Sequence, residues 1–440
     1  MHQWTGEAPQ TDALAEQLPP FSEHEALVEA NRCLYCYDAP CTHACPTHID
    51  IPKFIKKIST GNLTGSARTI LDANLLGATC SRVCPVQELC EGACVLGSEH
   101  KPISIGRLQR HAMDDFYARG ALPFSVPPPT RKTVAIVGAG PAGVSCAGEL
   151  ARRGHAVTIF EKRSLSGGLS TYGIISLREP IDVAVAEVEL VQRLGVQVKT
   201  GIELCRDIKL ADLQAQFDTV FLSSGQGYTP LLDIPGEEHV VDGLAYVEQS
   251  KLNPHTMHIG RNVTVVGAGN TAIDCATIAR RLGASNVTIV YRRSASEMSA
   301  YQHEYEFAKN EGIEFRFYTQ PVRVVVGAES VVALECVTMQ ASIDRRTPPK
   351  AIPGSEFLLP TDQIVKAIGQ ERPPLANLLG LQTRRGFVEV DMDFQTSLPG
   401  VYAGGDCIRA AGSCSTVMAV QDGKLAAAAI HQKLSGVTHG

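Results

Sequence analysis

Three features are missing from this 440-residue chain, and each absence excludes a class of protein. No apolar run approaches the roughly 18 residues that a membrane span needs, so we expect no membrane partner. The net charge of -6 carries no basic footprint, which argues against nucleic acid. The first residues have neither a cationic start nor an apolar stretch, which argues against a secretory signal. We therefore expect a cytoplasmic, reducing location.

Repeat arrays and long low-complexity tracts are also missing, as is any serine or cysteine arrangement typical of a catalytic triad. The hydrophobic share of 44% and the charged share of 20% are ordinary for a globular protein with real cores. The length allows two or three domains.

Cysteine is plentiful and unevenly placed, with eight of the fourteen in the first hundred residues. They form two quartets: Cys33, Cys36, Cys41 and Cys45, then Cys80, Cys84, Cys90 and Cys94. In a reducing location, clustered cysteines hold metal more often than they form disulfides. The first quartet reads C-x2-C-x4-C-x3-C-P, a run typical of iron–sulfur ligation.

Zinc and free thiols are the alternatives. A four-cysteine zinc site usually pairs two C-x2-C knuckles, and only Cys33 and Cys36 have that spacing. Iron–sulfur is therefore favoured. Because the last cysteine of such a run often binds a second cluster, Cys45 is expected to cross over. The other six cysteines are scattered and are interpreted as core or surface thiols.

The organisation along the chain predicts an α/β protein. Residues 23–119 read as helices separated by cysteine loops, and residues 122–129 as a proline-rich linker. Strand–helix alternation then continues to the C-terminus. We expect an N-terminal α-helical iron–sulfur domain (1–125) followed by two nested Rossmann-like domains. The first would bind FAD (126–255 and 375–440), and the second, inserted in it, would bind NAD(P)H (256–374).

The first glycine fingerprint follows a buried strand at 134–137 and opens a helix. Gly138 makes the tight turn, Gly140 lets a pyrophosphate approach, and Gly143 lets helix and strand pack closely. The next strand ends in Glu161, a carboxylate that can accept bonds from ribose hydroxyls. A glycine turn without a ligand is the alternative.

Two further segments favour FAD for this site. Gly168 and Leu169 follow the acid where a ribityl chain could run, and Asp406 lies at a strand end near the C-terminus. Thr416 and Val417 then open a helix, whose N-terminus can stabilise negative charge on the flavin. A simple capping role for Asp406 is the alternative.

The second fingerprint follows the strand at 263–266, and its next strand ends in Arg292 and Arg293 instead of an acid. Arginine can pair with a 2′-phosphate that a carboxylate would repel, which favours NADPH over NADH. A solvated surface pair is the alternative. The predicted contacts are Gly267, Gly269, Asn270, Thr271, Ala272, Arg292 and Arg293.

Three segments, residues 32–41, 76–85 and 102–109, resemble a known family. It is the electron-input subunit of NAD(P)-dependent dihydropyrimidine dehydrogenase, and the small subunit of glutamate synthase has a similar architecture. The resemblance covers nearly the whole chain. One departure is that relatives often carry a proline after the isoleucine equivalent to Ile174, where this chain has Ile175. The wall of the flavin pocket is therefore expected to differ.

The resemblance implies two 4Fe-4S clusters with crossed ligation. One set would be Cys33, Cys36, Cys41 and Cys94, and the other Cys45, Cys84, Cys90 and Gln109. Cys80 would be spare, although chemistry alone prefers its sulfur to an amide oxygen.

The resemblance also implies a function. Hydride would pass from NAD(P)H to FAD, with no side chain doing bond chemistry, and electrons would reach an FMN-containing partner through the clusters. That partner would reduce uracil or thymine, and a heterotetramer is expected. Feeding the large subunit of glutamate synthase is the main alternative. A disulfide reductase is less favoured, because the one C-x-x-C lies inside a cysteine quartet. A non-enzymatic scaffold is less favoured, because it would have no use for two nucleotide-binding fingerprints.

Overall fold

The computed structural model describes residues 12–120, 124–125, 127–328, 330–341, 347–410 and 414–436. Contacts divide the chain into two compact units, each described here by itself. The first unit contains Met1–Gln17, Tyr172–Pro180 and Gly227–Glu371. The second contains Leu18–Thr171, Ile181–Gln226 and Arg372–Gly440.

The second unit begins with a helical layer. Its helices are α1 (Glu23–Asn31), α2 (Pro40–Ala44), α3 (Ile51–Ser59), α4 (Leu63–Ala73), α5 (Gly77–Val83) and α6 (Ile105–Arg119). Ser22 caps α1 in a reciprocal bond with Glu25. Ile51, Phe54, Ile55 and Ile58 recur at helical spacing on α3, and all four are buried. Their burial against α4 and α6 supplies the core of this layer.

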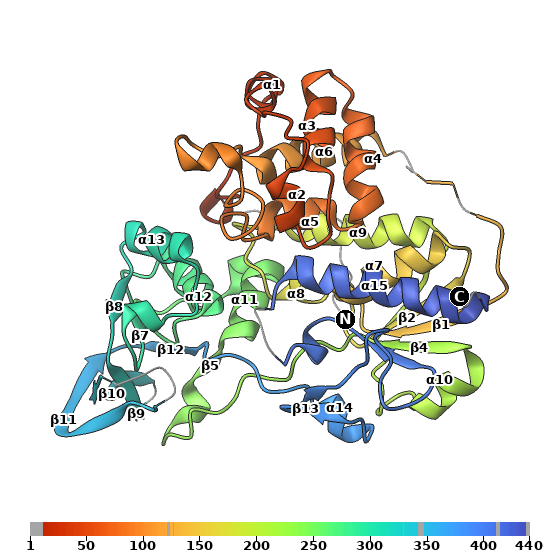
Figure 1. Cartoon of the computed structure of the whole chain (residues 1–440). Helices are drawn as coiled ribbons and strands as arrows, with labels where there is room; N and C mark the ends of the chain where they lie inside the picture. The colour runs from red at the N-terminus through yellow and green to blue at the C-terminus, as the bar shows by residue number, and fades with distance from the viewer. Residues whose placement is uncertain are drawn as a thin grey trace. The chain divides into compact units, whose positions relative to one another are not determined.

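The same unit contains a five-stranded parallel sheet in the order β15-β4-β1-β2-β3. The strands are β1 (Thr133–Val137), β2 (Ala156–Glu161), β3 (Gln197–Thr200), β4 (Thr219–Leu222) and β15 (Val401–Ala403). Its larger helices are α7 (Pro141–Ala151), α9 (Ile181–Arg193), α10 (Leu210–Gln216) and α15 (Thr416–Ser435), with short α8 (Leu169–Tyr172) and α14 (Pro374–Leu378). A small hairpin pairs β13 (Thr383–Arg384) with β14 (Phe387–Val388). Figure 1 shows α15 and α7 side by side, and they pack closely.

The first unit has its own parallel sheet in the order β5-β12-β6-β7-β8. Its strands are β5 (Val241–Asp242), β6 (Asn262–Val266), β7 (Asn286–Val290), β8 (Glu314–Arg316) and β12 (Gln363–Lys366). The helices are α11 (Gly243–Leu252), α12 (Asn270–Arg281) and α13 (Gln302–Asn310). The predicted fold class is confirmed, because helices come first along the chain and two parallel sheets follow. Strand β15 comes after the inserted unit and pairs with β4 in the sheet of the second unit.

The predicted strand–helix alternation is wrong at the β13–β14 hairpin and, over a longer stretch, at residues 319–360. Three consecutive strands, β9 (Thr319–Val326), β10 (Val331–Gln340) and β11 (Lys350–Pro360), form an antiparallel sheet. Residues of β10 alternate partly between buried and exposed, as in a sheet that packs with one face. Antiparallel neighbours need no crossover helix, so these strands can follow one another directly in the chain.

The two compact units do not share the bounds given above for the expected functional domains. Strand β5 pairs with β12, so the first unit's sheet begins before residue 256. Residues 172–180 and the described residues 12–17 also belong to that unit, where Gln17 N donates to Leu177 O at 2.8 Å. The linker expected at 122–129 lies partly outside the described residues. As functional domains, the bounds stay a prediction.

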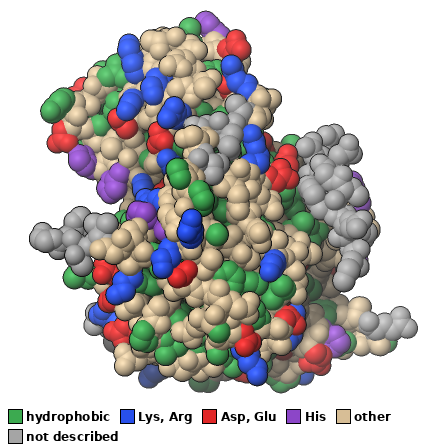
Figure 2. Space-filling view, turned by 90° about the vertical axis from the view of Figure 1, so that its right-hand side faces the viewer, with side chains coloured by type: hydrophobic (Ala, Val, Ile, Leu, Met, Phe, Trp, Pro, Cys, Tyr) green, Lys and Arg blue, Asp and Glu red, His purple; other side chains and the backbone are tan. Residues whose placement is uncertain are grey.

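No helix in the described part of the chain is long and apolar enough to cross a membrane. On the face drawn in Figure 2, acidic and basic side chains are interspersed among apolar ones.

Candidate functional site

Four cysteines line one pocket of the helical layer. They are Cys33, Cys36, Cys41 and Cys94, the set that the resemblance implies for one cluster. Burial, together with the neighbouring Cys33, Cys94 and Cys36, raises the pKa of Cys41 to about 11. Ionising Cys41 beside these neighbours needs a cationic centre, such as a bound metal cluster supplies. The chemistry of the donor set therefore fits an iron–sulfur cluster.

A second pocket gathers the remaining candidates: Cys45, Cys80, Cys84, Cys90 and Gln109. A hydrogen bond with Cys80, then burial, raises the pKa of Cys84. The Gln109 Nε2 donates to Gly77 O at 2.7 Å, which orients its amide. Cys80 and Gln109 thus both border this pocket, and the choice between them stays a prediction.

Within the described residues, no group of three or more His, Cys, Asp or Glu side chains is close enough for a single metal ion. A zinc ion bound at about 2.3 Å would draw four sulfurs to about 3.8 Å from one another. The ligands of a cluster bind different iron atoms and so lie farther apart.

The first fingerprint forms a close turn between β1 and α7. Gly138 has φ +99°, and a Cβ there would lie 2.5 Å from Ser223 O. A Cβ at Gly143 would lie 2.0 Å from Gly138 O. At Gly140 an added Cβ would make only an ordinary contact, 3.9 Å from the Gly168 Cα, so this position is less tightly packed than the other two. The turn thus leaves room for a phosphate at the N-terminus of α7, as a dinucleotide site requires.

Glu161 has a structural task that sequence reasoning missed. Its buried carboxylate accepts from Ala139 N at 2.7 Å and from Arg163 N at 2.8 Å. The side chain therefore ties the end of β2 to the fingerprint turn. Its contact with a ribose stays a prediction.

The other FAD candidates lie in the same unit. Gly168 packs on Gly140, where an added Cβ would be 2.7 Å from the Gly140 Cα, and Leu169 begins α8. Asp406 follows β15, and burial raises its pKa while Arg409 opposes that rise. Thr416 and Val417 form the first turn of α15, which Ser415 caps.

Val417 also lines the second cysteine pocket, beside Cys45 and Cys84. One helix turn therefore belongs to both the expected FAD site and the wall of the second thiol set. The sequence places these residues more than 300 positions apart, so no local pattern could reveal this.

The second fingerprint repeats the first turn with other neighbours. Gly267 has φ +127°, and a Cβ there would lie 2.2 Å from Ala367 O. Gly269 precedes α12, whose first turn holds Thr271 and the fully buried Ala272, and Asn270 Oδ1 accepts from Tyr301 N at 3.1 Å.

The two arginines at the end of β7 differ. Arg292 is exposed, whereas Arg293 forms a 2.7 Å ion pair with Glu297. Hydrogen bonds from Ser294, then from Arg293, lower the pKa of Glu297 to about 2. Arg292 is therefore the better placed of the two to meet an incoming phosphate.

A buried charge cluster in the first unit also escaped sequence reasoning. Arg178 pairs with Asp274 and, at 2.7 Å, with Glu304. Burial raises the pKa of Asp274 to about 7, and the Arg178 cation opposes the rise. This cluster holds the 172–180 segment on α12 and α13, and nothing in the sequence marks Arg178 for that task.

Comparison with protein families assigns both halves of the chain. Residues 10–121 match the model described as dihydropyrimidine dehydrogenase domain II, 4Fe-4S cluster. Residues 132–432 match the pyridine nucleotide-disulphide oxidoreductase model. The fold and site thus define an NAD(P)H-dependent oxidoreductase with FAD and 4Fe-4S clusters. The chain belongs to the pyridine nucleotide-disulphide oxidoreductase family.

Several named proteins are similar over most of the chain. The NAD-dependent dihydropyrimidine dehydrogenase subunit PreT of Escherichia coli O157:H7 is 35% identical over 97% of this chain and 99% of its own. The glutamate synthase [NADPH] small chain of Escherichia coli is 33% identical over 93% and 91%. The chain spans only 64% of the Escherichia coli oxidoreductase AegA and 60% of the formate dehydrogenase subunit beta of Moorella thermoacetica.

Solved structures show the fold. Mycobacterium tuberculosis FprA in complex with NADPH has a TM-score of 0.58 at 18% identity, covering 70% of this chain and 85% of that one. The thioredoxin reductase of T. acidophilum has a TM-score of 0.54 at 22% identity, covering 69% of this chain and 99% of that one.

Proposed function

We propose that this chain is the electron-input subunit of a dihydropyrimidine dehydrogenase. It would take hydride from NAD(P)H and deliver electrons to an FMN-containing partner that reduces uracil or thymine. Bound FAD supplies the change from two-electron to one-electron transfer, and bound clusters supply the one-electron relay. The chain's own residues bind and orient these groups. A heterotetramer with the partner is part of the proposal.

One observation supports the electron path above all others. The second cysteine pocket and the opening turn of α15 share Val417, inside one compact unit. A thiol set that borders the expected flavin site is suited to receive electrons from it. Cys33, Cys36, Cys41 and Cys94 would hold one cluster, and Cys45, Cys84, Cys90 and Gln109 the other.

The proposed nucleotide contacts are those expected from the sequence. For FAD they are Gly138, Gly140, Gly143, Glu161, Gly168, Leu169, Asp406, Thr416 and Val417. For NADPH they are Gly267, Gly269, Asn270, Thr271, Ala272, Arg292 and Arg293. The exposed Arg292 supports a preference for NADPH.

The second candidate is the small subunit of glutamate synthase, which the 33% identity to such a chain favours. Anaerobic co-purification with each candidate partner separates the two. The proposal expects NAD(P)H oxidation that depends on uracil with the FMN-containing partner. Oxidation that depends on glutamine and 2-oxoglutarate, with no response to uracil, would instead establish the second candidate.

A further inference from the structure

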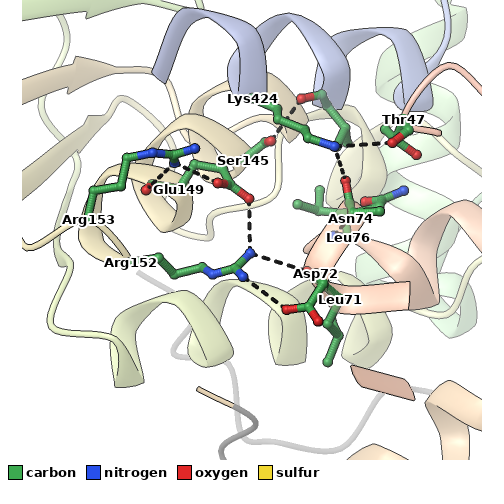
Figure 3. Close-up of polar contacts among 12 residues, drawn as sticks. Thr47, Leu71, Asp72, Asn74, Leu76, Ser145, Glu149, Arg152, Arg153 and Lys424 are labelled. Atoms are coloured by element: carbon green, nitrogen blue, oxygen red, sulfur yellow. Dashed lines mark hydrogen bonds and ion pairs between the residues drawn. The ribbon is translucent and has the colours of Figure 1, made fainter. Parts of the chain in front are cut away.

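One face of helix α15 points toward the helical layer of the same unit. Val417 and Lys424 are seven residues apart, about two turns, and so lie on the same side of the helix. Val417 lines the second cysteine pocket. The Lys424 ammonium donates to Thr47 O at 3.1 Å, as Figure 3 shows. It also donates to Ala73 O at 2.9 Å. These bonds join residues 377 and 351 positions apart.

Lys424 differs from the basic side chains beside it. Glu149 forms ion pairs with Arg152 at 3.1 Å and with Arg153 at 2.6 Å. Arg152 also forms an ion pair with Asp72 at 3.1 Å. In the described part of the chain, no carboxylate forms an ion pair with Lys424, whose partners are neutral carbonyls. Burial lowers the pKa of Lys424, while Glu149 and Cys45 oppose that lowering. The ammonium of Lys424 is therefore fixed in place by hydrogen bonds, but no ion pair with a described residue neutralises its charge.

The loop that Lys424 grips carries one of the candidate cluster ligands. Thr47 is fully buried, and its Oγ1 lies 3.4 Å from the Cys45 Sγ. The Lys424 ammonium is bonded to the carbonyl of the same threonine. A fixed, half-buried cation thus stands next to the second thiol set.

We propose that Lys424 raises the reduction potential of the iron–sulfur cluster held by the second thiol set. The inference rests on the proposed function, since it requires a cluster there. Accepting one electron from the reduced flavin makes the cluster one unit more negative, and a nearby cation in a low-dielectric setting stabilises that state. Lys424 acts through the field at the cluster and through its grip on the loop, so it is a positioning residue.

The test compares charge with hydrogen bonding at one position. Lys424→Arg keeps the charge, Lys424→Gln keeps a donor without charge, and Lys424→Met keeps only the apolar length. The whole chain is titrated anaerobically with dithionite and mediators, and each cluster is followed by electron paramagnetic resonance. We expect the second cluster's reduction constant to fall at least tenfold in the Gln and Met variants, which is 59 mV for one electron. The Arg variant should stay near wild type.

Two internal controls sharpen the result. The first cluster should keep its potential in every variant, and Arg152→Met removes another bond to the helical layer whose charge is already neutralised. Equal shifts in the Arg and Met variants, or an equal shift in Arg152→Met, would reduce Lys424 to a structural tie. Failure of all three Lys424 variants to retain iron would overturn the tuning role in the same way. A wild-type chain without cluster signals would instead refute the proposed function.

Discussion

The two glycine fingerprints use one backbone plan and opposite chemistry at the end of the following strand. In both, a Cβ added to the first glycine would collide with a neighbouring carbonyl oxygen, that of Ser223 in one and that of Ala367 in the other. The first site ends its second strand in the buried Glu161, which binds the turn's own backbone. The second ends in the exposed Arg292. The shared glycine turn suits a dinucleotide in both sites. The residue at the end of the following strand differs: in the first site it supports the turn, and in the second it presents a positive charge.

The largest effect is expected at the third fingerprint position. In Gly143→Ala the added Cβ would meet Gly138 O at 2.0 Å, a backbone atom that cannot yield. Overpacking of this kind costs about 1–3 kcal/mol or more, and we expect most of the bound flavin to be lost. Flavin absorbance per chain and the Tm measure it. The matched change Ala272→Gly should cost only about 1 kcal/mol and leave flavin content intact. Equal flavin content in both variants would break the comparison.

The second effect tests whether Glu161 stabilises the first fingerprint turn. Both oxygens of Glu161 accept from backbone N–H groups, so Glu161→Gln would point an amide NH₂ at one of them. An unsatisfied buried donor costs about 1–3 kcal/mol, and flavin affinity should fall by about tenfold or more. Flavin Kd from fluorescence quenching checks it. An unchanged Kd would show that the carboxylate does not hold the turn.

The third effect tests the charge at the second site. Charged hydrogen bonds contribute about 1.5–3 kcal/mol, so Arg292→Gln should lower kcat/KM for NADPH by about tenfold to a hundredfold. The value for NADH should stay within about twofold. Arg293→Gln should discriminate less, because Glu297 already pairs with Arg293. Equal losses with both nucleotides would contradict the 2′-phosphate role.

The smallest effect concerns pH. Ser294 and Arg293 lower the pKa of Glu297 to about 2, so its contacts stabilise the fold above its unfolded pKa and are lost only as the pH falls through about 2. Between pH 8 and 5 Glu297 stays ionised, whereas a phosphate monoester titrates near 6. As the pH falls, the preference for NADPH should therefore decline in one step near pH 6. Glu297→Gln should not change the pH of that step. A second step that disappears in this variant would refute this view.

Local patterns sufficed for much of the fold. The strand ahead of each fingerprint and the helix after it are encoded within about a dozen neighbouring residues, and the structure has them. The grouping of Cys94 with Cys33, Cys36 and Cys41 came from the family resemblance, since spacing alone assigned only the crossover of Cys45. Whether these side chains hold the cofactors stays a prediction.

The missed features share a physical cause. Lys424 bonds to backbone carbonyls, Glu161 to backbone amides, and Arg178 to carboxylates 96 and 126 positions away. Backbone groups carry no residue identity, and distant partners leave no periodicity. The antiparallel strands β9–β11 were missed because their register is set by pairing along the sheet and not by any single segment.

Strand β15 lies at the edge of the parallel sheet of the second unit, next to β4, and α15 packs on α7. Residues 401–435 leave the ribosome long after the turn at Gly138, so this sheet lacks its edge strand until they have been made. The inserted unit, whose strands are consecutive, can mature meanwhile. Incorporation of flavin and of the second metal centre should accordingly be late events in the life of the polypeptide.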